Sequence, residues 1–93
     1  MVTTEKEPAL SNLLAAYESE INAHARYKAF ALKAEAEGLP RAASLFRAAA
    51  RAEQIHAGNH ARAIRHMRGD ARAEIHPFRV NNTLENLRSA LFG

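Results

Sequence analysis

The chain has 93 residues, and its 13 Lys and Arg against 10 Asp and Glu leave a net charge of +3 when histidine is neutral. This length predicts a single small domain over residues 1–93. The absence of cysteine excludes a disulfide, a cysteine zinc site and an iron–sulfur cluster. The arginines are spread along the chain without interleaved aromatic residues, which argues against a nucleic-acid partner.

The apolar segments are too short for targeting or for membrane insertion. The first apolar run, residues 13–16, is followed closely by Glu18 and Glu20 and does not resemble a signal peptide. No segment approaches the roughly 20 apolar residues that a membrane-spanning helix needs. We therefore expect a cytoplasmic protein with no membrane partner.

Two long helices are predicted, because alanine is abundant while glycine and proline are rare. The first should run from about 8 to 37, beginning near Pro8, since proline suits a first helical turn. Its apolar residues recur at steps of three and four, which predicts one inward face: Leu10, Leu13, Tyr17, Glu20, His24, Tyr27, Ala31 and Ala34. Gly38 should end this helix and Pro40 should open the next.

The second helix should run from about 40 to 69. Its predicted inward face comprises Ala42, Leu45/Phe46, Ala49, Ala52/Glu53, His56, Asn59/His60, Ala63 and Met67. A loop over 70–82, interrupted by Pro77, should precede a short helix over 83–92, for which Thr83 is the predicted N-cap. The fold class is therefore all-α, an antiparallel helical hairpin with a short C-terminal helix.

Both inward faces carry a polar patch at mid-length. Glu20 and His56 each lie eighteen positions from Gly38, so an antiparallel hairpin places them at the same level. Glu53 and His56 share a helical face because they are three residues apart. Uncompensated burial of these charges would cost several kcal/mol per ion, and a divalent metal would neutralise them. A solvated Glu-x-x-His surface pair is the alternative interpretation.

Other side chains near this patch admit two interpretations each. His24 and His60 are candidate ligands, or groups that orient the ligands from outside the metal's own coordination shell. Tyr27 is predicted to pack in the core with its hydroxyl tied to the carboxylates.

Residues 12–57 resemble the first half of a rubrerythrin, a member of the ferritin-like di-iron family. The resemblance rests on N-L-L-A-A before Glu20, on A-R-Y-K-A-F-A-L-K-A-E-A-E-G before the turn, and on E-Q-I-H-A at Glu53 to Ala57. It implies that Glu20, Glu53 and His56 are iron ligands, that Glu53 bridges two ions, and that Tyr27 lies beside the carboxylates as a catalytic candidate. The implied function is reduction of hydrogen peroxide, or oxidation of iron(II) by peroxide or dioxygen.

Two features depart from that family pattern. Rubrerythrins often carry a rubredoxin-like site with four cysteines, so this cysteine-free chain implies an external electron donor, such as a rubredoxin-like protein. Residues 84–93 also echo residues 10–19, with Leu10, Asn12, Leu13 and Ala16 recurring as Leu84, Asn86, Leu87 and Ala90. The position corresponding to Glu20 would follow Gly93. We therefore expect either the N-terminal half of a longer protein or a half that functions as it stands.

A symmetric homodimer would complete the site. Di-iron four-helix bundles use one Glu from each of two helices and a Glu-x-x-His from each of the other two, and one chain supplies half of that set. Two chains would then hold two iron ions per assembled site. The alternatives are an iron-storage ferroxidase, a non-catalytic helical interaction module from a truncated rubrerythrin, or a basic nucleic-acid binder.

Overall fold

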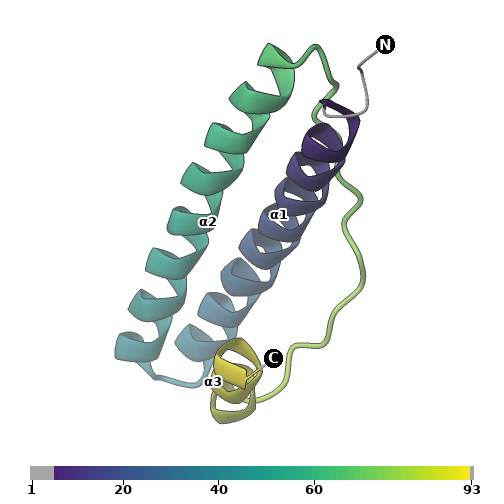
Figure 1. Ribbon diagram of the computed structural model, residues 1–93. Helices are drawn as coiled ribbons and strands as arrows, with labels where there is room; N and C mark the ends of the chain where they lie inside the picture. The colour runs from purple at the N-terminus through teal and green to yellow at the C-terminus, as the bar shows by residue number, and fades with distance from the viewer. Residues whose placement is uncertain (1–5, 93) are drawn as a thin grey trace.

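The computed structural model describes residues 6–92, and over that range the chain forms three helices and no strand. Helices α1 (Lys6–Ala36) and α2 (Pro40–His66) lie side by side and antiparallel, while α3 (Thr83–Phe92) packs near the turn that joins them (Figure 1). The molecule is elongated, with extents of 58 × 19 × 18 Å. The predicted all-α hairpin with a short C-terminal helix is confirmed. Within residues 6–92, no helix is both long and apolar enough to cross a membrane.

The turn between α1 and α2 depends on Gly38. This residue has φ +73°, a left-handed conformation that costs glycine nothing. The Gly38 amide donates to the Glu35 carbonyl over 3.0 Å, and the Leu39 amide donates to the Ala34 carbonyl over 2.9 Å. This pair of bonds is a Schellman motif, which satisfies carbonyls left over at the helix end. Pro40 then begins α2, so only three residues separate the helices and the hairpin is antiparallel.

Aromatic rings form the centre of the core near the turn. Phe30 and Phe46 meet edge to face with their centroids 5.3 Å apart, and Tyr27 and Leu87 pack against them. The buried residues of α2 are Ala43, Phe46, Ala50, Ala57, Ala61 and Ile64. The predicted inward face of α2 is therefore wrong by about one residue, since Ala49 is only half-buried and His56 is exposed. Alanines lie on almost every side of this helix, and the packing of Phe46 and Ile64 selects the face that is buried.

Helix α2 ends at His66, earlier than the expected position near 69. The left-handed residue is Arg68, with φ +62°, and the Gly69 amide closes the turn by donating to the Ile64 carbonyl over 2.9 Å. Gly69, unlike Gly38, does not have a positive φ. A Cβ atom at Gly69 would lie 2.7 Å from Leu10 Cδ1 and 3.0 Å from Ile64 Cγ2, so a larger residue here would force the Leu10 side chain to move.

The segment between α2 and α3 runs back along α1 (Figure 1). Asn22 joins it to α1, because its Nδ2 donates to the Glu74 carbonyl and its Oδ1 accepts from the His76 amide, each over 2.7 Å. At the start of α3, the side chain of Asn82 accepts from the Glu85 amide over 2.9 Å. Asn82 is therefore the N-cap, and the prediction of Thr83 was wrong. The Thr83 side chain is buried, and its amide donates to Glu37 at the end of α1.

Candidate metal centre

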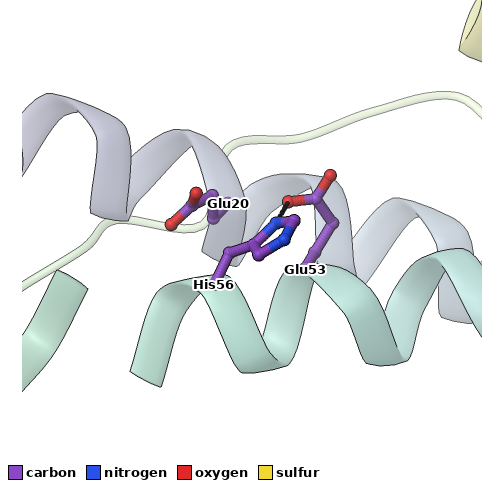
Figure 2. Close-up of side chains that lie close together, drawn as sticks. All are labelled: Glu20, Glu53 and His56. Carbon is purple, nitrogen blue, oxygen red and sulfur yellow. Dashed lines mark ion pairs between the residues drawn. The ribbon is translucent and has the colours of Figure 1, made fainter. Parts of the chain in front are cut away.

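Three side chains of the kind that bind metals converge from the two long helices. Glu20 comes from α1, while Glu53 and His56 come from α2 and face it (Figure 2). Each residue offers one oxygen or nitrogen atom, and these atoms all lie within 4.8 Å of one another. His56 Nδ1 lies 3.6 Å from Glu53 Oε1, as expected for residues three apart on one helical face. The hairpin thus brings together the three residues predicted as ligands.

The cluster lies at the edge of the interface between α1 and α2 rather than at its centre. The side chains of Glu20 and Glu53 are 17 % and 26 % exposed, whereas that of His56 is 56 % exposed. The neighbouring buried position on α2 is Ala57. The carboxylates are therefore shielded by the hairpin itself, and the imidazole faces outwards.

His60 contacts the cluster directly. Its Nδ1 lies 2.6 Å from Oε1 of Glu20, and its side chain is 33 % exposed. This pairing was not predicted, because counting from Gly38 places Glu20 level with His56. Helical side chains tilt towards the N-terminus of their helix. On α1 that direction leads away from the turn, which brings Glu20 within reach of a residue one turn beyond His56. This tilt is the signal that could have identified the pair.

His24 has a different environment. Its Nδ1 lies 2.7 Å from the carbonyl oxygen of Ala50, so this ring is tied to the backbone of α2. It lines an open groove between the helices together with Lys28, Arg51 and Gln54. Within residues 6–92, the metal-ligand cluster does not include His24.

Tyr27 lies in the aromatic core. Its ring stacks on Phe46 with centroids 6.2 Å apart and lies 6.3 Å from Phe30. In the part of the chain that the structure describes, no hydrogen bond joins its hydroxyl to Glu20 or Glu53, and the partner of Glu20 is His60. The prediction of core packing is confirmed, and the prediction that the hydroxyl is tied to the carboxylates is wrong. The catalytic role of Tyr27 stays a prediction.

The chemistry of the three donors fits iron. Carboxylate oxygen and imidazole nitrogen are both donors that non-haem iron accepts, and no soft sulfur donor is present. Two carboxylates and one imidazole are half of the set found in di-iron four-helix bundles. The donor set therefore fits half of a di-iron centre.

Comparison with known proteins places these residues in a family context. The family model described as rubrerythrin matches residues 11–90 of this chain. Among curated proteins, nigerythrin of Nitratidesulfovibrio vulgaris (strain Hildenborough) is 51 % identical over 49 residues. That match covers 53 % of this chain and 24 % of nigerythrin, so the chain corresponds to about a quarter of that relative. No solved structure matches.

Proposed function

The chain belongs to the rubrerythrin family, and from this premise we propose that it is a non-haem di-iron protein that reduces hydrogen peroxide. The observation that carries the proposal is the convergence of Glu20, Glu53 and His56, whose donor atoms lie within 4.8 Å of one another. Family membership implies iron binding. Bound iron would supply a redox centre with an open position for the oxidant.

The roles of this chain's residues follow from their chemistry. The carboxylates of Glu20 and Glu53 would hold the metal and offset its positive charge. His56 supplies a neutral nitrogen donor from the exposed side. Reduction of hydrogen peroxide to two water molecules consumes two electrons and two protons. The chain has no cysteine with which to bind a rubredoxin-like iron site, so the electrons come from a separate donor, such as a rubredoxin-like protein.

Tyr27 is the proposed catalytic side chain. Its ring is held by Phe30 and Phe46, so its hydroxyl keeps a defined place on α1, two turns from Glu20. Tyr27→Phe retains the ring packing and removes only the hydroxyl. We expect this variant to bind metal normally and to turn over peroxide more slowly.

A symmetric homodimer supplies the missing half of the site. One hairpin offers three donors, which leaves two iron ions short of ligands. The side chains of His56 and Glu53 are 56 % and 26 % exposed, so both are accessible to a second hairpin. Two chains related by a two-fold axis then contribute two copies of each donor and hold two ions, one per chain. Because metal binds only the assembled form, it stabilises the dimer by mass action.

An anaerobic titration with iron(II), followed by native mass and peroxide consumption, tests these proposals. Wild-type protein should bind one ion per chain, become dimeric, and consume peroxide when a reductant is supplied. Glu53→Gln should lose binding, dimer stabilisation and turnover. The matched control is Glu85→Gln, which neutralises an exposed carboxylate on α3 and should behave as wild type.

Three other outcomes lead to different conclusions. Accumulation of a mineral core without peroxide turnover would identify a storage ferroxidase. Tight binding by a persistent monomer would refute the shared site. Failure to bind iron(II) would refute the di-iron function and leave a helical interaction module.

A further inference from the structure

One hydrogen bond connects the candidate metal cluster to a residue outside it. His60 Nδ1 and Glu20 Oε1 are 2.6 Å apart and join α2 to α1. A second pair of charged side chains between these helices, Arg47 and Glu35, is half-exposed and lies nearer the turn. The His60–Glu20 pair is better shielded, with side chains 33 % and 17 % exposed. A bond in this setting constrains the carboxylate more than a surface ion pair does.

Glu20 is the member of the cluster that needs such a constraint. Glu53 and His56 are three residues apart on one helix, so the helix itself fixes their spacing. Glu20 approaches from α1 on a long, flexible side chain. Its carboxylate can rotate away from α2 unless another group holds it.

We propose that His60 is a positioning residue for the metal centre. Its Nδ1–H donates to Oε1 of Glu20 and holds this carboxylate towards Glu53 and His56 before metal arrives. A carboxylate has lone pairs to spare on both oxygens, so Glu20 can accept this bond and still bind a cation. This inference rests on the proposed function, since it requires that Glu20, Glu53 and His56 bind metal.

His24 provides a matched comparison within the same hairpin. Both histidines are half-buried, and both use Nδ1 to contact the opposite long helix. His24 contacts the backbone carbonyl of Ala50 over 2.7 Å, whereas His60 contacts a predicted ligand. Loss of either ring removes one bond between α1 and α2. Only loss of His60 should change how the cluster binds metal.

The test is an anaerobic titration of the full chain with cobalt(II), whose visible absorption reports its coordination, and separately with iron(II). Thermal unfolding of the metal-free proteins serves as the structural readout. His60→Leu should weaken metal binding about 10- to 100-fold, the usual cost of losing a group that orients a ligand. His60→Asn should restore affinity to within a few-fold of wild type, because its amide nitrogen lies near the place of Nδ1. His24→Leu should lower thermal stability without changing affinity or the cobalt spectrum.

A third substitution keeps the inference testable if leucine at this position prevents folding. His60→Gln retains a polar side chain but places its amide near Nε2, so it should bind metal as weakly as His60→Leu. Equal affinity of wild type, His60→Leu and His60→Gln would overturn the inference, as would an equal loss in His24→Leu. In either case binding by wild type and its loss in Glu53→Gln would leave the proposed function standing. Absence of binding by wild type would refute both.

Discussion

The Asn22 side chain is expected to stabilise the packing of the segment between α2 and α3 against α1. Its side chain is 7 % exposed and makes two hydrogen bonds across that boundary, to the Glu74 carbonyl and from the His76 amide, each over 2.7 Å. Asn22→Ala removes both, together with the bond from Nδ2 to the Glu18 carbonyl within α1. A net contribution of about 1 kcal/mol per bond predicts a loss of about 2 kcal/mol. For a domain of this size, a loss of about 2 kcal/mol lowers the melting temperature by roughly 8–16 °C relative to a control variant with the same change in helix propensity.

The control variant must correct for helix propensity, because alanine is a better helix former than asparagine by roughly 0.6 kcal/mol. Asn12→Ala makes the same change at an exposed position of α1. The free-energy difference between the two variants, measured by urea unfolding at matched protein concentration, should be about 2 kcal/mol. Hydrogen exchange should show that the His76 amide loses protection in Asn22→Ala alone. Equal stability of the two variants, with the His76 amide still protected, would refute this account of the segment.

Three further outcomes follow from individual residues. Gly38→Ala should destabilise the protein by about 1 kcal/mol, because φ is +73° there. Gly58→Ala should stabilise it by roughly 0.5–1 kcal/mol, because Gly58 lies within a helix and its Cβ would meet nothing within 4 Å. Thermal unfolding measures the direction of each change. The backbone amide of Glu74 donates to the Glu18 carboxylate, and His76 lies near it. Both lower the pKa of Glu18 below its ordinary 4.5. The resulting stability is present above pH 4.5 and is lost as pH falls through the lowered pKa. In Glu18→Gln the free energy of unfolding in urea should therefore decline less steeply on acidification. The same steepness as in wild type would contradict this.

The helices and the turn were predictable because their causes are local. Alanine-rich sequence forms helix almost independently of its surroundings, and Gly38 followed closely by Pro40 ends one helix and begins the next. A turn of this length makes the hairpin antiparallel. Counting outwards from Gly38 then placed Glu20 opposite His56, and the structure brings these residues together with Glu53.

The caps and the buried face of α2 depended on contacts between distant residues. Asn82 and Thr83 are both good N-cap residues. Asn82 takes this position while the Thr83 amide donates to Glu37, directly after α1. A helix with alanine on most sides has several faces that could be buried, so periodicity alone could not identify the correct one. The large side chains Phe46 and Ile64 select it by filling the space against α1.

His24 and His60 show the same contrast, between what local sequence predicts and what contacts between distant residues decide, at the candidate site. From helical spacing alone, His24 and His60 are expected near the polar patch, but the role of each stays open. Tertiary structure tied His24 to the Ala50 carbonyl and His60 to the carboxylate of Glu20. The physical reason is that a hydrogen bond depends on side-chain direction and on the offset between two packed helices to within about an ångström. Helical periodicity specifies position only to the nearest turn, about 5 Å.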